Sequence, residues 1–260
     1  MSDKTSLGDR MKQYEAASRY VLPPRVPAIL RIDGRAFHTY TKQSGLAVSK
    51  QGNDPFSEVI RDAMIEAAVA LIDDISGAEL AYIQSDEISL LVQDDATFTT
   101  QPWFGKVLAK VTSVSASIAA AHFNRNIERR VGDSSLKLAY FDARAFVLSW
   151  EEVNNYFLWR QNDATKNSIS MLAQFHFPHN RLQGMNGSHM QDLLMLEKKI
   201  NWNDLDVWKK RGYCVRRVPE AGIVIDLEPP IFSKDKEYTC ANYHARMRKV
   251  TEDKIVGETQ

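Results

Sequence analysis

The stretch AYIQSDEISLLV, residues 81–92, predicts two short strands that are interrupted by a pair of adjacent carboxylates. Apolar and β-branched residues on both flanks favour strands, roughly from Leu80 to Gln84 and from Ile88 to Val92. Asp86 and Glu87 stand between them, and burying a carboxylate without a partner is costly. A turn of the residues QSDE would lift both carboxylates onto the edge of a sheet. We therefore expect a hairpin whose tip needs a cation or hydrogen bonds.

The composition is that of a globular chain without net charge. The chain has 260 residues, of which 44% are hydrophobic, and its 33 Lys plus Arg balance 33 Asp plus Glu. No global field favours nucleic acid, so any RNA partner must meet a local basic patch. The two cysteines lack metal or redox spacing, the polar first residues are unlike a signal peptide, and no run of about 18 apolar residues occurs. We expect a soluble, cytoplasmic protein without a membrane segment.

The periodicity of the rest of the chain predicts alternating helices and strands. Expected strands are Ala28–Ile32 and Leu138–Trp150, and the best candidate boundary in the second half is His176–Gly187. The expected helices are Leu7 to about Tyr20, a helix opened by Asp54 as N-cap and Pro55 in the first turn, Phe104–Phe123, Glu151 to about Phe175, and Ser188–Ile200. This β-α-β-β-α-β order favours an α+β sheet covered by helices over a doubly wound parallel sheet.

A further acidic residue ends the first predicted strand. In AILRIDGRAFH, residues 28–38, Asp33 follows the apolar run, and Gly34 allows the backbone to approach a ligand closely. The amides that follow could cradle phosphate oxygens, with charge from Arg35, His38 and Lys42. Asp33 and Asp86 on neighbouring strands could hold two Mg²⁺ ions across a triphosphate, as in two-metal nucleotidyl transfer. Asp-Gly is also a common turn and Ser-Asp-Glu a common solvated loop tip, so the pattern alone leaves both interpretations open.

RIDGRAFH, followed further along the chain by QSDEISLLV, resembles the tRNA-histidine guanylyltransferase family, and more closely its bacterial, archaeal and phage-type Thg1-like relatives. The resemblance continues in order, roughly from Leu7 to Val215, in YFDARAFVLSW, YFLWRQNDATKNSI, RLQG and INWNDLDVWKKRGYCV. It implies an enzyme that adds nucleotides to the 5′ end of tRNA in the 3′ to 5′ direction, on a core like the palm of polymerases and nucleotide cyclases. It also implies two Mg²⁺ ions, GTP or another nucleoside triphosphate, ATP, and assembly as a homotetramer.

The resemblance assigns roles to individual residues. Asp33 and Asp86 would bind the metal ions together with the backbone carbonyl of Gly34, and Glu87 would support these catalytic carboxylates. The residues implied to line the nucleotide are Asp33, Gly34, Arg35, Ala36, Phe37, His38, Lys42, Ser85, Asp86 and Lys110. Residues 1–150 would form the palm-like catalytic core, and residues 151–260 a helical and C-terminal extension packed on it as one compact unit.

Basic and aromatic residues elsewhere are candidates for RNA contact. Arg129 and Arg130 form a basic island suited to an RNA backbone, and Trp159 beside Arg160 is a combination that can stack on a base. Ordinary surface charge and a core tryptophan are the plainer alternatives. Lys106 and Lys110 are expected on one helix face, and the basic tail Arg246–Val250 is assigned to the surface.

The residues TKNS, 165–168, decide the branch of the family. Eukaryotic tRNA-histidine enzymes carry a motif beginning His-Ile-Asn-Asn there, of which only Asn167, a candidate RNA contact, remains. The resemblance therefore implies template-dependent repair of 5′-truncated tRNA, with histidine-tRNA guanylylation as the alternative. A nucleotide cyclase, which would share the palm and both aspartates, and a non-catalytic RNA-binding module remain as rivals. FDARAF, residues 141–146, echoes IDGRAF but lacks the glycine and a downstream SDE, so Asp142 is interpreted as structural.

Overall fold

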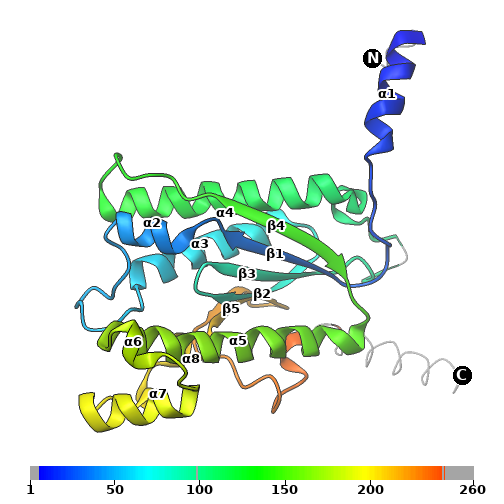
Figure 1. The fold of residues 1–260 in the computed structure, drawn as a ribbon. Coiled ribbons are helices and arrows are strands. Elements are labelled where there is room, and N and C mark those ends of the chain that lie inside the picture. The colour runs from blue at the N-terminus through cyan, green and yellow to red at the C-terminus, as the bar shows by residue number, and fades with distance from the viewer. Residues whose placement is uncertain (1–5, 98, 242, 244–260) are drawn as a thin grey trace, which may run out of the picture.

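A computed structural model describes residues 6–97, 99–241 and 243, and its centre is a six-stranded antiparallel sheet (Figure 1). The strand order is β4-β1-β3-β2-β5-β6, and every neighbouring pair is antiparallel. The strands are β1 (Ala28–Gly34), β2 (Ala78–Gln84), β3 (Glu87–Val92), β4 (Phe141–Val147), β5 (Tyr213–Val218) and β6 (Gly222–Asp226). The predicted hairpin of β2 and β3 is present, and with the covering helices it makes an α+β fold, as the sequence predicts.

Helices cover both faces of the sheet. α3 and α4 pack on one face and α5 on the other, while α1 stands away from the body (Figure 1). The helices are α1 (Ser6–Ala17), α2 (Phe37–Gln43), α3 (Glu58–Asp74), α4 (Leu108–Val131), α5 (Trp150–His176), α6 (His179–Leu182), α7 (Gly187–Leu193) and α8 (Val207–Arg211). No helix within the described residues is long and apolar enough to cross a bilayer.

The two-sided cover explains why the central strands are apolar almost throughout. Successive side chains of a strand point to opposite faces. Leu30 and Leu90 therefore pack with α3 and α4, whereas their neighbours Ile29 and Leu91 pack against α5. Each of these four side chains is at most 2% exposed, so both faces of β1 and β3 belong to the core.

The predicted start of α3 is wrong, because a different residue caps the helix. The Ser57 hydroxyl accepts a hydrogen bond from the backbone N–H of Ile60 at 3.4 Å, and the helix begins at Glu58. Asp54 instead accepts from the backbone N–H of Phe56 at 2.9 Å and forms an ion pair with Lys209 at 2.9 Å. The carboxylate of Asp54 thus ties this loop to α8, a contact that only tertiary structure creates.

The start of α4 also differs from its prediction. Phe104 and Gly105 adopt left-handed backbone conformations, which end a short 3-10 turn, and α4 proper begins at Leu108. Lys106 consequently does not share a helix face with Lys110. Its buried ammonium group donates to the backbone carbonyls of Pro23 and Val26 and pairs with Asp94 at 2.9 Å. This contact holds the start of α4 beside the segment that leads into β1.

Several elements were not predicted from sequence. These are the short helix α2, the strand β5 with the edge strand β6, and α6 within the stretch His176–Gly187. The strand expected from Leu138 starts only at Phe141, and the helix expected to reach Ile200 ends as α7 at Leu193, followed by a π-helical turn, Leu194–Lys198. The basic tail Arg246–Val250 lies outside the described residues.

Candidate active site

The ends of β1 and β2 bring Asp33 and Asp86 together. Asp33 stands near the end of β1, and Ser85 and Asp86 form the two-residue turn between β2 and β3. Ser85 has a φ of +50°, the left-handed conformation that a tight two-residue hairpin requires. The backbone N–H of Gly34 donates to the backbone carbonyl of Asp86 at 3.1 Å. The turn is therefore docked against the end of β1, and both carboxylates lie at one edge of the sheet.

Gly34 is needed because of a close approach. A Cβ atom at this position would lie 2.4 Å from Cδ2 of Phe37 and 2.9 Å from Oδ2 of Asp86. Both distances are shorter than side chains allow, so any other residue would push either the aromatic ring or the carboxylate aside. The backbone of β1 thus reaches the Asp86 carboxylate directly, as the sequence predicts for the glycine after Asp33.

Burial and mutual repulsion disfavour ionisation of both aspartates. Burial is the main cause that raises the pKa of Asp86 to about 6; the nearby charges of Asp33 and Glu87 add to it, and a hydrogen bond from Ser85 opposes it. The pKa of Asp33 is raised by burial first, and then by Glu87 and Asp142. Two adjacent carboxylates that are hard to ionise form a site that favours a bound cation.

The donor set suits Mg²⁺ rather than a metal held entirely by protein. No group of three or more His, Cys, Asp or Glu side chains with metal-binding geometry occurs among the residues the structure describes. Mg²⁺ is usually held by one or two carboxylates together with waters and substrate phosphates. Asp33 and Asp86 supply two carboxylates for that pattern, and the small residue Gly34 leaves the space next to the Asp86 carboxylate open.

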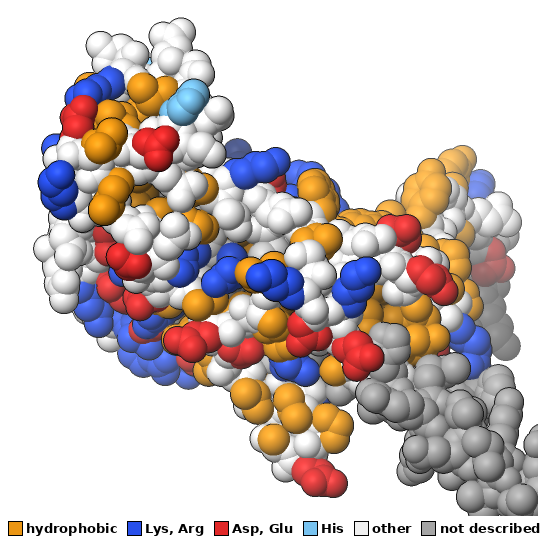
Figure 2. Space-filling model, turned by 90° about the horizontal axis from the view of Figure 1, so that it is seen from below, with side chains coloured by type: hydrophobic (Ala, Val, Ile, Leu, Met, Phe, Trp, Pro, Cys, Tyr) orange, Lys and Arg blue, Asp and Glu red, His pale blue; other side chains and the backbone are white. Residues whose placement is uncertain are grey.

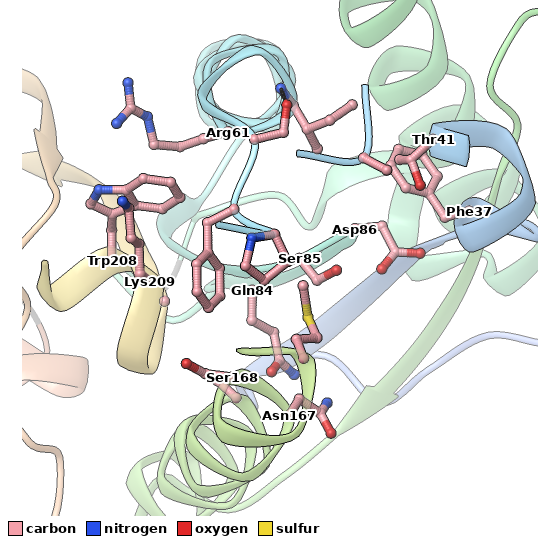
Figure 3. Close-up of a pocket in the computed structure, with 18 of the residues that line it drawn as sticks. Phe37, Thr41, Arg61, Gln84, Ser85, Asp86, Asn167, Ser168, Trp208 and Lys209 are labelled. Carbon is pink, nitrogen blue, oxygen red and sulfur yellow. Dashed lines mark hydrogen bonds between the residues drawn. The ribbon is translucent and has the colours of Figure 1, made fainter. Parts of the chain in front are cut away.

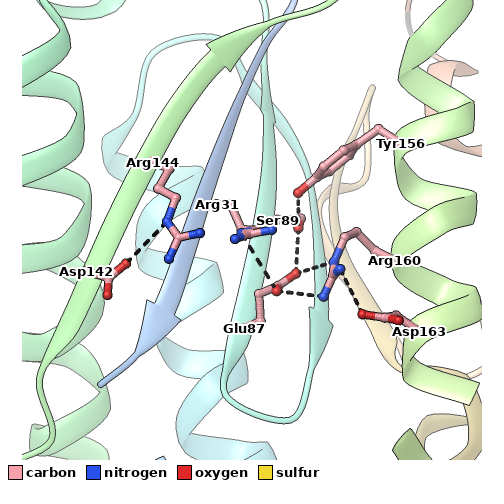
Figure 4. A network of polar contacts seen from close by, with 8 residues as sticks. All are labelled: Arg31, Glu87, Ser89, Asp142, Arg144, Tyr156, Arg160 and Asp163. Carbon is pink, nitrogen blue, oxygen red and sulfur yellow. Dashed lines mark hydrogen bonds and ion pairs between the residues drawn. The ribbon is translucent and has the colours of Figure 1, made fainter. Parts of the chain in front are cut away.

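Glu87 is the first residue of β3 and does not lie in the turn, contrary to the sequence expectation (Figure 4). It is 8% exposed, and its two carboxylate oxygens accept hydrogen bonds from Nε and Nη2 of Arg160 at 2.7 and 2.8 Å. Ser89 donates to it at 3.2 Å, and Arg31 lies 3.9 Å away. The protein therefore compensates the charge of Glu87 itself. Its role is to fix the β2–β3 hairpin onto α5.

The segment after β1 supplies the remaining predicted nucleotide contacts. Ala36, with a φ of 52°, reverses the chain, and α2 begins at Phe37, whose ring is buried against Phe123 and Phe141. The first N–H groups of a helix have no intrahelical acceptor, so those of α2 can serve an anion. Arg35, His38 and Lys42 are exposed around this turn.

A pocket of about 530 Å³ opens beside the Ser85–Asp86 turn (Figure 3). That volume lies within the range of small-molecule sites. Its walls come from distant parts of the chain: the end of β2, the start of β5, α2, α3, α5 and α8, whereas Asp33 and Gly34 of β1 do not line it. Apolar residues dominate the lining, and the polar groups among them include Gln84, Ser85, Asp86, Asn167, Ser168, Arg61 and Lys209.

Lys110 does not join this site within the chain. It lies in the first turn of α4, next to the segment preceding β1, since Leu22 and Leu108 pair by backbone hydrogen bonds with Lys106 and Tyr20. Asp33 stands at the opposite end of β1 (Figure 1). Lys110 instead places its ammonium group 5.8 Å from the centre of the Phe104 ring. Its resemblance to a phosphate-contacting lysine does not fit this position in a single chain.

The residues that were predicted to contact RNA differ in how exposed their side chains are. Arg160 is 6% exposed and committed to Glu87, so the prediction that it contacts RNA is wrong, whereas its neighbour Trp159 is 51% exposed. Arg129 and Arg130 lie in the last turn of α4 and form ion pairs with Glu66 and Asp62 of α3. Asn167 lies in the wall of the pocket.

The echo between IDGRAF and FDARAF reflects strand pairing. β1 and β4 run antiparallel with Asp33 opposite Asp142 and Arg31 opposite Arg144. The side chain of Asp142 is 60% exposed and lies 4.0 Å from Arg144, and Figure 4 shows this pair beside the Glu87 network. Asp142 contributes negative charge near Asp33 without entering the pocket.

Sequence reasoning missed several pocket residues. Trp208 and Lys209 of α8 and Arg61 of α3 line the wall opposite Asp86 (Figure 3). The guanidinium of Arg61 lies 4.8 Å from the centre of the Trp208 ring. No local pattern links these segments. Gln84, however, was visible as the one polar residue on the face that Leu80 and Tyr82 share.

The comparisons with known proteins agree with this geometry. The family model for Thg1, tRNAHis guanylyltransferase, matches residues 8–149, more than half of the chain. The chain belongs to the Thg1 family.

Solved structures of Thg1-like proteins share the fold over most of their length. A bacterial tRNA(His) guanylyltransferase (Thg1)-like protein in complex with ATP is 53% identical, with a TM-score of 0.83 over 90% of this chain and 97% of that chain. A structure of a bacterial Thg1-like protein in complex with GTP is 45% identical, with a TM-score of 0.74 over 90% and 97%. A probable tRNA(His) guanylyltransferase of Drosophila melanogaster is 27% identical over 209 residues, 75% of this chain and 68% of the relative.

Asp86→Asn should stabilise this Thg1 family member in the absence of metal. The pKa of Asp86 in the folded chain, about 6, lies above the ordinary value of 3.8, so ionisation with rising pH destabilises the fold. At about 1.4 kcal/mol per pKa unit, the variant should gain about 2 to 3 kcal/mol at pH 7, and the gain should vanish near pH 4, where the carboxyl is protonated. Urea unfolding in EDTA across this pH range measures it. A gain independent of pH, or an equal gain in the exposed control Asp142→Asn, would contradict the assignment.

The Glu87–Arg160 pair should show strong energetic coupling. Arg160→Met leaves a buried carboxylate without its main partner and should cost about 3 kcal/mol of unfolding free energy. The double variant Glu87→Leu with Arg160→Met should lose less than the sum of the single losses, by about 2 kcal/mol. Urea unfolding gives all terms. Arg129→Ala, which removes an exposed ion pair with Glu66, is the control and should change stability by less than about 0.5 kcal/mol. Additive losses at Glu87 and Arg160 would refute the coupling.

Proposed function

We propose that this chain is a tRNA 5′-end nucleotidyltransferase that adds nucleotides in the 3′ to 5′ direction. Membership of the Thg1 family supports the reaction class, and the site supports the chemistry. The observation that carries the proposal is the meeting of Asp33 and Asp86 at one sheet edge, beside a pocket of about 530 Å³. The strand order β4-β1-β3-β2 with crossing helices on one face supports a palm-like core.

Asp33, Asp86 and the backbone carbonyl of Gly34 would hold two Mg²⁺ ions. When bound, these ions lower the cost of forming an alkoxide nucleophile and stabilise the leaving phosphate. Ser85 and the segment from Asp33 through His38 would line the triphosphate of ATP, GTP or another nucleoside triphosphate. The N–H groups of Gly34 and Arg35 already donate to the carbonyls of Asp86 and Tyr140, so the phosphates would use the amides that begin α2.

The 5′ phosphate of the RNA would take the adenylyl group of ATP, with release of pyrophosphate. The 3′ hydroxyl of the incoming nucleotide would then attack the 5′ phosphorus, lose its proton to solvent, and displace AMP. A 5′ triphosphate end needs no activation and releases pyrophosphate.

The tRNA would contact exposed residues at the end of α4 and on α5, which lie on opposite faces of the sheet. Positive and negative side chains are interspersed on the face shown in Figure 2, so contacts with the RNA there would be made by individual basic residues and not by one continuous basic surface. Trp159, 51% exposed, offers a ring for base stacking, and Arg129, exposed at the end of α4, offers a phosphate contact. We assign the protein to the cytoplasm, where its tRNA substrate would be found.

The proposed substrate is a 5′-truncated tRNA. The enzyme should extend a tRNA that lacks its first nucleotide, add the base complementary to the 3′ strand, and stop when the acceptor stem is paired. We expect kcat/KM for this substrate to exceed that for intact histidine tRNA at least tenfold, about 1.4 kcal/mol of transition-state binding. Labelled nucleotides with Mg²⁺ and defined tRNAs measure it, and Asp33→Asn, which should lose incorporation, is the control. Guanosine added to intact histidine tRNA regardless of the opposing base would favour the guanylyltransferase alternative instead.

A nucleotide cyclase is the remaining catalytic candidate, because it would use the same two aspartates. Incubation with GTP or ATP alone distinguishes it by formation of a cyclic product. A non-catalytic RNA-binding module would retain tRNA without incorporating label.

The homotetramer is proposed to use α1. This helix has no buried residue, and Leu7, Met11 and Tyr14 lie on one side of it with exposures of 57%, 45% and 71%. A helix of 12 residues is marginal by itself in water, so a partner is expected to cover this stripe. Replacing all three residues by Ser should lower the molar mass in solution, measured by light scattering after gel filtration. Gln13→Ser, on the opposite side of α1, should leave it unchanged; an unchanged mass in the triple variant would refute this interface.

A further inference from the structure

Gln84 has a largely buried side chain whose amide group forms no hydrogen bond with the residues that the structure describes. It is the last residue of β2, on the same face as Leu80 and Tyr82, and it is 7% exposed. No residue that the structure describes forms a hydrogen bond with its side chain, although other buried amides, such as Gln161 and Asn154, are satisfied. Neither amide atom of Gln84 is among the fully buried polar atoms that lack a partner, so the amide opens onto the pocket beside the active site. A ligand in that pocket can therefore form hydrogen bonds with both of its polar groups.

The surroundings of Gln84 define the kind of ligand that would satisfy it. Figure 3 shows its side chain pointing toward α5, with the amide near Ser168 and Asn167. Ser168 is already engaged, because its hydroxyl accepts from the indole N–H of Trp202 at 3.0 Å. The rest of the lining is largely apolar and aromatic: Phe37, Leu46, Phe56, Met171, Phe175 and Trp208. A flat apolar ligand with hydrogen-bonding groups on one edge fits these walls, and a purine base has that chemistry.

We infer that Gln84 reads the purine base of the nucleotide substrate, an inference that rests on the proposed function. Asp86, which would bind the metal ions at the triphosphate end of the nucleotide, lies two residues after Gln84. A Gln amide presents a donor and an acceptor side by side, which matches adenine through its amino group and a ring nitrogen. Rotating the amide by half a turn exchanges donor and acceptor, and the same side chain then matches O6 and N1–H of guanine. One residue thus accounts for a pocket that accepts both purines.

Calorimetric binding of four ligands in Mg²⁺ tests this role: ATP, GTP, purine riboside triphosphate, and inorganic tripolyphosphate. Gln84→Met keeps the shape of the side chain and removes both hydrogen-bonding groups. It should weaken ATP and GTP binding about tenfold each and leave tripolyphosphate unchanged. Purine riboside triphosphate, which lacks the exocyclic group, should lose less affinity than ATP. Gln183→Met, an exposed glutamine at the end of α6 outside the pocket, is the control and should bind all four ligands like wild type.

Gln84→Glu gives a second, internally controlled measurement. A carboxylate only accepts hydrogen bonds, so it can bind N1–H and the amino group of guanine but cannot donate to adenine. The ratio of GTP to ATP affinity should rise about tenfold, whatever the added charge does to both ligands equally. This ratio is measurable even if Gln84→Met does not fold.

Four results would overturn the inference. ATP and GTP binding to Gln84→Met as tightly as to wild type, or an unchanged GTP-to-ATP ratio in Gln84→Glu, would show that Gln84 does not contact the base. An equal loss of tripolyphosphate and ATP affinity in Gln84→Met would show that Gln84 acts on the shape of the neighbouring turn. In these three cases the proposed function stands. Failure of wild type to bind any of the nucleotides would overturn the proposed function and this inference together.

Discussion

The bidentate ion pair between Glu87 and Arg160 is the contact on which the site depends. It joins the start of β3 to the middle of α5, two segments far apart in the chain. Because both groups are buried, the pair tolerates no loose geometry, and the second carboxylate of the Asp-Glu pair is fixed in the sheet. Asp86 is thereby held one residue earlier, in the turn. Together with the hydrogen bond from Gly34 to the carbonyl of Asp86, this anchor sets the position of the hairpin tip relative to α5 and the pocket.

The protein treats its neighbouring carboxylates in opposite ways. Glu87 receives an arginine, a serine hydroxyl and a second arginine nearby, whereas Asp86 faces the charges of Asp33 and Glu87, which disfavour its ionisation. Charge that the fold does not compensate is left for a ligand. The destabilisation that follows is typical of functional sites, where stability is lower than the fold alone would permit. The same logic applies to Gln84, whose amide opens onto the pocket and forms no hydrogen bond with the described residues.

The pocket is assembled by the sheet rather than by any one segment. β2 pairs with β3 on one side and with β5 on the other. α8 directly precedes β5 in the chain, so this pairing places α8 in the wall of the pocket. α5 crosses the opposite face and contributes Asn167 and Ser168. Lys209 of α8 pairs with Asp54, which holds the wall of the pocket to the loop before α3. Changes in α8, in α5 or in the loop before α3 would therefore alter the same cavity.

The sequence by itself determined the hairpin, the α+β class, the two aspartates, and the glycine at which the backbone of β1 comes close to Asp86. Alternation, turn chemistry and a close-approach glycine are local properties, so the sequence shows them directly. Only the tertiary structure decided what those local patterns face. It moved Glu87 from the turn into the core, since its partner Arg160 lies 73 positions further along the chain. It separated Lys110 from the site, because the left-handed residues before α4 set where that helix begins. It brought α8 and α5 to Gln84, since strand pairing and packing over long sequence distances follow from the whole core and leave no local signal.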